Sequence, residues 1–297
     1  MITIVNNGGA QKISKLCGKE HPEVSYNYLR KLLKNKDVKV NGARVSEDVV
    51  VGAGDTVELY ANDKYLYTFV PNVVYEDDNV LVVNKPRGIE TTGDIGAGAY
   101  EEKLNEYYGG RQSAAPTSGA AQGSRFRAVH RLDTNTEGLV IFAKTSSAEK
   151  ELLRAIKAGE IVKYYLALVE GAVTDAGRYT AFLRKKKDIG KVEVTETPRG
   201  ADSHKIITDV NPIDFLDGAT LCEIYIATGK THQIRAHLAF LGHPVIGDGK
   251  YGKNAVNRAF GKKEQCLTAH KIVFNFCKGS PLAYLNSKRL SVKADFS

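Results

Sequence analysis

The residues best suited to chemistry lie in one short loop, His130-Arg131-Leu132-Asp133, between two segments of strand-like composition. In this loop the carboxylate of Asp133 stands two positions from the cation of Arg131. A carboxylate can act as a nucleophile or as a general base, and a nearby cation favours its charged form. The simpler interpretation is a turn in which Asp133 accepts hydrogen bonds from backbone N–H groups. On local chemistry alone the turn is favoured, so other motifs have to decide.

The motifs of several common mechanisms are absent from the sequence. It has no GxGxxG after a strand, no GxxxxGK[ST], no HExxH and no GxSxG. The four cysteines form no CxxC pair, and His232 and His237, five positions apart, do not share a helix face. We therefore expect no metal site and no cofactor, and neither nucleotide-driven nor serine-nucleophile chemistry.

Short strands and a few helices must hold the loop in place. Residues 73–86 (VVYEDDNVLVVNKP) predict two strands joined by a turn at Asp77–Asn79, and residues 163–171 predict a further strand. Thr231 is expected to cap a helix that Gly242 closes. Many strands with few helices and no regular βαβ alternation predict an α+β domain rather than a doubly wound one.

Composition sets wider limits. The chain has 297 residues, of which 42% are apolar, so it can bury a core, and it contains no run of apolar residues long enough to span a membrane. It lacks the pattern of a signal peptide, and widely spaced cysteines fit a reducing cytosol, so we expect a cytoplasmic protein. A net charge of +8 favours a polyanionic partner. Residues 111–124 are rich in Ala, Ser and Gly and are expected to form a loop.

The first part of the chain has a separate pattern. Residues 25–36 (SYNYLRKLLKNK) predict a helix with three leucines on one face and Arg30, Lys31 and Lys34 on the other. Between Asn27 and Val45 there are six basic residues and one acid. Such a segment suits a surface that follows phosphates, and the alternative is a solvated helix face.

The order of elements decides between these alternatives. The basic helix, KVNGxRV at residues 39–45 and VxxGDxVxL at residues 51–59 together resemble the RNA-binding domain named after ribosomal protein S-four, over roughly residues 11–62. That family binds structured RNA through the basic helix and the adjacent turn. The resemblance therefore implies four RNA-binding residues, Arg30, Lys31, Lys34 and Arg44. With residues 61–72 as a linker, we expect a small α/β domain at residues 1–68 and a catalytic domain at residues 69–297.

The larger part carries a second resemblance, through motifs that occur in a fixed order. HRLDxxTxGL at residues 130–139 with FAK after it, and the long stretch TGKTHQIRAHLAFLGHPVIGDxxYG at residues 228–252, are similar to the signatures of the RluA-type RNA pseudouridine synthases. Lys85-Pro86-x-Gly88, Lys163-x-Tyr165 and LTAHK match the family's other elements. This resemblance implies the pseudouridine synthase fold, with a largely antiparallel mixed sheet.

Transferred residue by residue, the resemblance makes Asp133 the catalytic carboxylate. Tyr165 would pack against the target base, Arg235 would pair with Asp133, and Arg131 would lie near the displaced nucleotide. The reaction breaks the bond from ribose to uracil nitrogen and rejoins the base through carbon, with no net redox change. It needs a carboxylate, an aromatic surface and a cation, but no metal or cofactor. The target must leave its stack, which costs roughly a few kcal/mol.

Each supporting residue also has a simpler interpretation. Tyr165 could belong to the core, although Tyr164 must then point to the opposite face. Arg235 could be a surface helix residue. Two positions depart from the family pattern: Glu137 replaces a small Ser, and Lys230 replaces an Arg, with loss of bidentate geometry. A charge at Glu137 would repel Asp133, so we expect Glu137 to point away from the site.

The sequence thus predicts a cytoplasmic, monomeric isomerase that converts specific uridines to pseudouridine. By resemblance its substrate is structured RNA, with large-subunit ribosomal RNA favoured and transfer RNA as the alternative. A catalytically inactive RNA-binding or ribosome-assembly protein is the rival hypothesis, which the retention of Asp133, Tyr165 and Arg235 argues against. A nucleoside hydrolase is a weaker alternative, because no water-activating group is visible.

Overall fold

The computed structural model describes residues 1–21, 24, 26–61, 69–93, 98–111, 125–186 and 190–296. The chain forms two compact units, Met1–Pro71 with Thr92–Gly123, and Asn72–Thr91 with Ser124–Ser297. The predicted linker at residues 61–72 and the predicted loop at residues 111–124 lie largely outside the described residues. The domain boundary between residues 68 and 69 falls at the edge of the same gap, so it stays a prediction.

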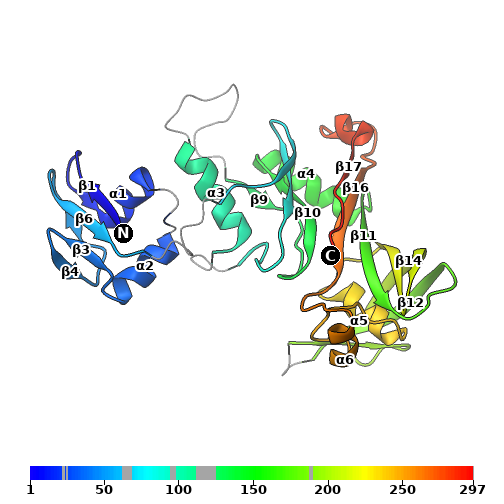
Figure 1. Ribbon diagram of the computed structural model, residues 1–297. Coiled ribbons are helices and arrows are strands. Elements are labelled where there is room, and N and C mark those ends of the chain that lie inside the picture. Colours follow the sequence, from blue (N-terminus) through cyan, green and yellow to red (C-terminus); the bar gives the residue numbers. More distant parts are fainter. Residues whose placement is uncertain are drawn as a thin grey trace. The chain divides into compact units, whose positions relative to one another are not determined.

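The first unit contains a four-stranded antiparallel sheet. Its order is β1 (Ile2–Val5), β6 (Thr56–Leu59), β3 (Val38–Val40) and β4 (Ala43–Val45). Helices α1 (Ile13–Glu20) and α2 (Tyr26–Lys34) pack on this sheet, with their apolar side chains in one shared core (Figure 1). β2 (Gln11–Lys12) and β5 (Val50–Val51) pair separately, and α3 (Tyr100–Arg111) also belongs to this unit.

The expected helix of the first unit is confirmed between residues 26 and 34. Its three leucines are buried, whereas Arg30, Lys31 and Lys34 are exposed. The Asn41-Gly42 turn has positive φ at both residues, 51° and 81°, as a tight hairpin turn requires. The Asn41 side chain donates to Asp55 and accepts from the Thr56 N–H, so it ties the NG turn to the GD turn.

Within the described residues of the second unit, eleven strands form one sheet. Its path runs through β13 (Val192–Thr195), β12 (Gly177–Lys185), β14 (His204–Leu216), β15 (Ala219–Ile226), β11 (Ile161–Glu170), β16 (Leu267–Phe274), β10 (Glu137–Ala143), β8 (Val80–Lys85) and β7 (Val73–Glu76). β9 (Arg127–Ala128) pairs with β10, and β17 (Arg289–Ser291) pairs with β16. Neighbours are antiparallel except β10 and β16, which run parallel. The predicted α+β class with a largely antiparallel mixed sheet is confirmed.

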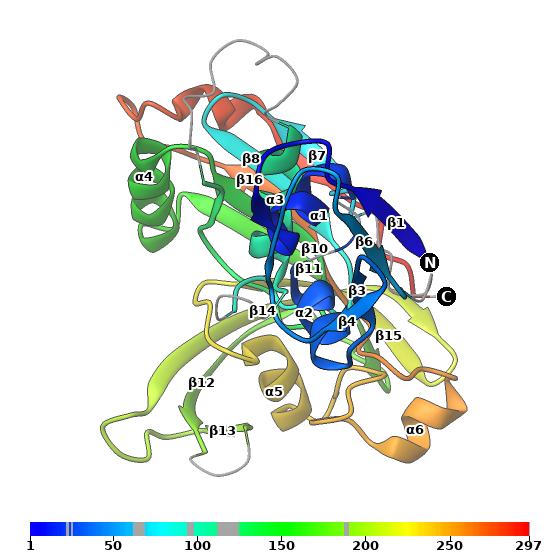
Figure 2. The same cartoon turned by 90° about the vertical axis from the view of Figure 1, so that its left-hand side faces the viewer.

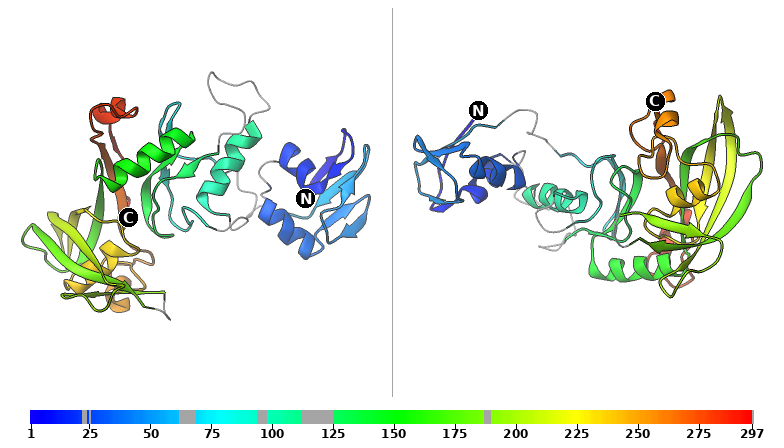
Figure 3. Two further views of the ribbon diagram at one scale, coloured as in Figure 1. Left: turned by 180° about the vertical axis from the view of Figure 1, so that it is seen from behind. Right: turned by 90° about the horizontal axis from the view of Figure 1, so that it is seen from below.

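Helices pack on the two parts of this sheet. α4 (Ser146–Lys157) contributes Leu152 to a core with β8, β10 and β16, and α5 (Gln233–Phe240) contributes Ala236 to a core with β12, β13 and β14. Figure 2 shows α5 in the curve formed by β12, β13 and β14, and Figure 3 shows the same unit from behind and from below. A short helix, α6 (Asn254–Ala259), and a 3₁₀ turn, Ala283–Ser287, complete the unit.

Two local features aim side chains at one place in the second unit. The register between β11 and β16 shifts between Tyr164, which pairs with Lys271, and Tyr165, which pairs with Ala269. Gly138, at the start of β10, has φ 118°, and any Cβ there would overlap the Ala269 backbone carbonyl. This close approach brings the start of β10, and with it the preceding loop, next to β16 and β11.

Candidate active site

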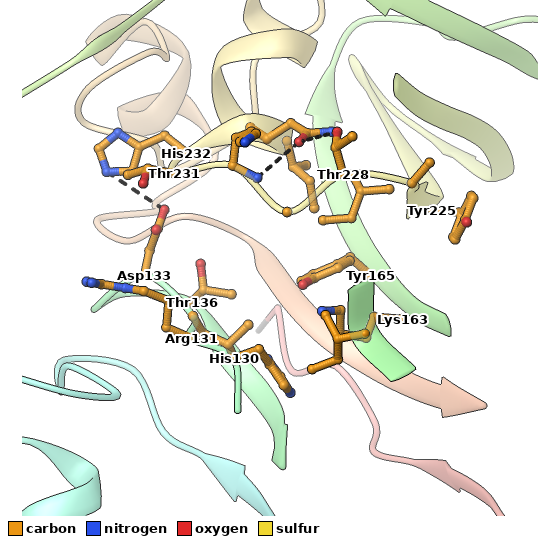
Figure 4. Close-up of a pocket in the computed structure, with 18 of the residues that line it drawn as sticks. His130, Arg131, Asp133, Thr136, Lys163, Tyr165, Tyr225, Thr228, Thr231 and His232 are labelled. Atoms are coloured by element: carbon orange, nitrogen blue, oxygen red, sulfur yellow. Dashed lines mark hydrogen bonds and ion pairs between the residues drawn. The ribbon is translucent and has the colours of Figure 1, made fainter. Parts of the chain in front are cut away.

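A cavity of about 360 Å³ opens in the second unit beside the loop that ends in Asp133. Its walls are residues 129–136, the first half of β11, and the segment from Tyr225 to the start of α5. Figure 4 shows Asp133 and His232 on one side and Tyr165 and Lys163 on the other. The volume lies within the range of about 300–1,000 Å³ that is typical of small-molecule sites.

Hydrogen bonds from distant segments fix the loop around Asp133. The buried Thr91 hydroxyl accepts from the Leu132 N–H at 3.0 Å and donates to the Leu132 carbonyl at 3.1 Å. The Thr134 carbonyl accepts from the Gly88 N–H at 2.9 Å and from the Lys85 ammonium at 3.3 Å. The loop backbone is therefore preorganised, and Lys85 holds it in place without lining the cavity.

The Asp133 carboxylate is paired with Arg235, which the sequence predicted. The Arg235 Nη1 donates to Asp133 Oδ2 at 2.7 Å, although the two residues lie 102 positions apart. The remaining side of the guanidinium makes a bidentate contact with Asp248, from Nε at 2.7 Å and from Nη2 at 2.9 Å. Arg235 is buried, so the simpler interpretation of a surface helix residue is wrong.

Asp248 is a site residue that the sequence argument missed. Its side chain is fully buried, and its Oδ1 also accepts from the backbone N–H groups of Lys250 and Tyr251. Burial by itself raises the pKa of Asp248, but the hydrogen bonds and charge of Arg235 and the two backbone donors lower it overall. The sequence did contain a signal that could have identified Asp248, because this residue lies inside the long motif at residues 228–252.

His232 also lies beside the site, with its Nε2 3.9 Å from Asp133 Oδ2. Its Nδ1 lies 2.9 Å from the Tyr251 hydroxyl, which also accepts from the Val192 N–H at 2.9 Å. Burial, with the charges of Arg235 and Lys250, lowers the pKa of His232 although Asp133 opposes the change.

The start of α5 differs from the prediction. The helix begins after His232, which has φ 54°, and Thr231 makes no capping hydrogen bond. Instead, the Gln233 side chain bonds to the segment before the helix. Its Oε1 accepts from Thr228 Oγ1 at 2.8 Å and from the Lys230 N–H at 3.2 Å. The left-handed turn at His232 directs the chain back toward Asp133.

Tyr165 lines the cavity from β11, although it is only 6% exposed. Its hydroxyl makes no hydrogen bond with any described residue. Burial, and then the charge of Asp133, raise the pKa of Tyr165, so that it is a neutral phenol at neutral pH. Tyr164 points to the other face, where the Lys271 ammonium lies 4.1 Å from its ring centroid. The alternating orientation inferred from sequence is confirmed.

The remaining predicted residues occupy different places. Arg131 is exposed at the edge of the cavity. Lys230, one of the two residues that depart from the family pattern, is exposed there as well. The other departure, Glu137, does not line the cavity, because its carboxylate pairs with Arg87 at 2.9 Å. The prediction that it points away from the site is confirmed.

The four basic residues of the first unit lie on its surface. Arg44 donates from Nη1 to the Lys36 carbonyl and lies 5.9 Å from the centroid of the Tyr60 ring. Their predicted RNA-binding role depends on exposure and charge, which the structure provides, but it stays a prediction.

The described residues contain no group of three or more His, Cys, Asp or Glu side chains placed to hold a metal ion. Among the same residues, none of the helices combines the length and the apolar character that a membrane span requires.

Comparison with known proteins assigns this arrangement to a family. Residues 79–240 match the RNA pseudouridylate synthase family. The ribosomal large subunit pseudouridine synthase D of Xylella fastidiosa is 30% identical to this chain. The alignment spans 84% of this chain and 74% of that protein. An uncharacterized RNA pseudouridine synthase of Bacillus subtilis is also 30% identical, with coverage of 84% and 82%.

Solved structures agree on the fold. Human RNA pseudouridylate synthase domain containing 4 aligns with a TM-score of 0.59 at 19% identity, over 76% of this chain and 89% of that chain. Human RNA pseudouridylate synthase domain containing 1 aligns with a TM-score of 0.55 at 23% identity, over 77% and 91%. The sequence matches place the chain in the RNA pseudouridylate synthase family, and the fold agrees.

Proposed function

We propose that this protein isomerises specific uridines to pseudouridine in large-subunit ribosomal RNA. The observation that carries the proposal is the carboxylate of Asp133, held by buried Arg235 at 2.7 Å on the wall of a cavity that Tyr165 also lines. The substrate class is supported by the names of relatives such as that of Xylella fastidiosa, which refer to the large ribosomal subunit. Transfer RNA is the alternative substrate, and we assign the protein to the cytoplasm as a monomer.

Each site residue has a part in this proposal. Asp133 begins the reaction at the target nucleotide, and Arg235 holds its carboxylate in one orientation. Tyr165, which lines the cavity, supplies a neutral aromatic surface for the base after the bond to ribose is broken. Arg131, exposed at the cavity edge, is placed to fill the stack that the nucleotide leaves.

We further propose that residues 1–68 form a docking domain for structured RNA. Its contact surface is the exposed side of α2, with Arg30, Lys31 and Lys34, together with Arg44 on β4. Each phosphate contact releases a counterion, so such a surface makes binding strongly dependent on salt. The domain would then add affinity without taking part in the chemistry.

Substrate class is tested with transcripts that carry tritium at carbon 5 of uracil, because isomerisation expels this hydrogen to water. We expect release from large-subunit ribosomal RNA and little from transfer RNA. Release from transfer RNA alone would replace the proposed substrate, and binding without release from either RNA would favour the inactive RNA-binding protein.

The docking surface is tested in the full-length protein with Arg30, Lys31 and Lys34 all changed to Gln. The slope of log affinity against log salt should become shallower by about 2–3 if these residues contact phosphates. The matched control changes three exposed lysines of the second unit that lie outside the cavity, Lys278, Lys288 and Lys293. An unchanged slope in the α2 variant would refute the docking role.

A further inference from the structure

One wall of the cavity carries a cation, Lys163, that has no partner among the described residues. Lys163 stands two positions before Tyr165 on β11, so both side chains leave the strand on the same face, and both line the cavity (Figure 4). The Lys163 ammonium makes no hydrogen bond and no ion pair with any residue that the structure describes. Its side chain is half-buried, and burial lowers the pKa of Lys163 to about 8.

His130 lines the cavity beside Lys163 but does not neutralise it. The His130 Nε2 accepts from the Ile141 N–H at 3.2 Å, so the proton of the neutral ring is on Nδ1. That Nδ1 is shielded from solvent, so it is not open to a ligand in the cavity. Burial, and then the nearby charge of Lys163, keep the pKa of His130 well below its usual value. The ring is therefore neutral, and Lys163 is the cation of this wall.

The charged and titratable groups around Lys163 do not neutralise it. The Asp133 carboxylate lies across the cavity and is already paired with Arg235. On the neighbouring strand β16, His270 and Lys271 are bonded to Glu223, at 3.0 and 2.6 Å. The other titratable residues that line the cavity are neutral or cationic: His130, Arg131, Tyr165, Tyr225, Lys230 and His232.

Lys163 is a half-buried cation for which the described residues supply no counter-ion. Such an arrangement is costly, so it favours a ligand that brings negative charge. Uracil becomes such a ligand during the family's reaction. When the bond between N1 and the ribose carbon breaks, both electrons stay with N1, and the charge is shared with the ring oxygens. If Asp133 instead adds to the ring, the electron pair also moves onto a ring oxygen. The base therefore takes up negative charge by either route.

We propose that Lys163 binds a carbonyl oxygen of the target uracil and stabilises the negative charge that the base acquires when it is released from the ribose. This inference rests on the proposed function and assigns the subsite for the base. The new bond then forms from C5 to the ribose carbon, the C5 proton is lost, and N1 gains a proton, so atoms and charge balance. Lys163 keeps its own proton throughout and is a catalytic residue in the sense that it touches the base.

The first test compares Lys163→Met with wild type on an RNA that the wild type modifies, by single-turnover tritium release. Loss of one preorganised donor to a developing anion typically lowers the rate about 10²–10³-fold. We expect a fall of this size with RNA affinity changed less than about threefold. The matched control is Lys271→Met, which removes a lysine on the other face of the sheet and should retain the wild-type rate.

The second test uses pH, which a purely structural lysine would not affect. The ammonium is charged below a pKa of about 8 and is lost above it, so kcat/KM of the wild type should fall about tenfold between pH 7 and pH 9. Lys163→Arg retains its charge over this range, so its kcat/KM should stay nearly constant. An identical alkaline fall in Lys163→Arg, or a Lys163→Met variant with the wild-type single-turnover rate, would overturn the proposal. A wild type that releases no tritium from any RNA would instead refute the proposed function itself.

Discussion

Replacing Asp248 with Asn tests how the active site is held together. Asp248 is fully buried and accepts four hydrogen bonds, two from Arg235 and one each from the N–H groups of Lys250 and Tyr251. Asn has the same shape, but one of its two polar atoms is a donor. In either orientation its NH₂ group faces an N–H donor, so part of the bidentate contact must break and the Arg235 charge loses its buried partner.

The expected magnitude follows from this geometry. Removing one partner of a buried ion pair costs about 3–5 kcal/mol. For a unit of this size each kcal/mol shifts Tm by about 2–4 °C, so calorimetry should find the transition lowered by about 6–20 °C. Activity should fall at least about tenfold because Arg235 is no longer fixed against Asp133, but it should not vanish, since Asp133 itself is intact.

The chain offers a matched control for this substitution. Asp209 makes the same bidentate contact with Arg178, at 2.8 Å for both bonds, but on the surface. Exposed pairs contribute about 0–1 kcal/mol, so Asp209→Asn should lower Tm by less than about 4 °C and leave activity unchanged. Equal Tm shifts in Asp248→Asn and Asp209→Asn would refute the reasoning that burial makes the Asp248 contact essential.

Two further predictions concern other parts of the second unit. Gly138→Ala should lower the free energy of unfolding by several kcal/mol or prevent folding, because the new Cβ would overlap the Ala269 carbonyl. The control is Gly159→Ala, at φ 73° in open space, which should lower it by only about 1 kcal/mol in denaturant titrations. Burial lowers the pKa of His237 to about 4, whereas the pKa in the unfolded chain is about 6.5. The stability that the neutral His237 contributes is therefore complete above pH 6.5 and is lost as the pH falls toward 4. The loss is about 3 kcal/mol at full extent, and denaturation of His237→Gln at pH 7 and pH 5 should show a smaller acid-induced decrease than wild type; an equal decrease would exclude His237 as a cause.

Much of the fold could be predicted because its signals are local. Short runs rich in apolar residues identified β8 and β11, and the leucine spacing identified α2 within two residues at each end. The turn at Asp77–Asn79 is confirmed, with Asp77 accepting from the N–H groups of Asn79 and Val80. The arrangement of the eleven-stranded sheet could not be read in this way, because strand order depends on contacts between distant segments.

The site was predictable only in part for the same reason. Asp133, Tyr165 and Arg235 were found through motif resemblance, whereas spacing alone favoured a turn, a core residue and a surface residue. Asp248 was missed because nothing local distinguishes a buried carboxylate from a loop carboxylate; its partner Arg235 lies 13 positions away across a turn. Thr231 was wrongly expected to cap α5, because side-chain propensity does not reveal that His232 adopts a left-handed conformation.

The most direct test of the central claim is tritium release from large-subunit ribosomal RNA by the wild type and by Asp133→Asn, with RNA binding measured for both. We predict release by the wild type, none above background by Asp133→Asn, and equal RNA affinity for the two proteins. Release by Asp133→Asn at the wild-type rate would contradict the role of Asp133 as the catalytic carboxylate.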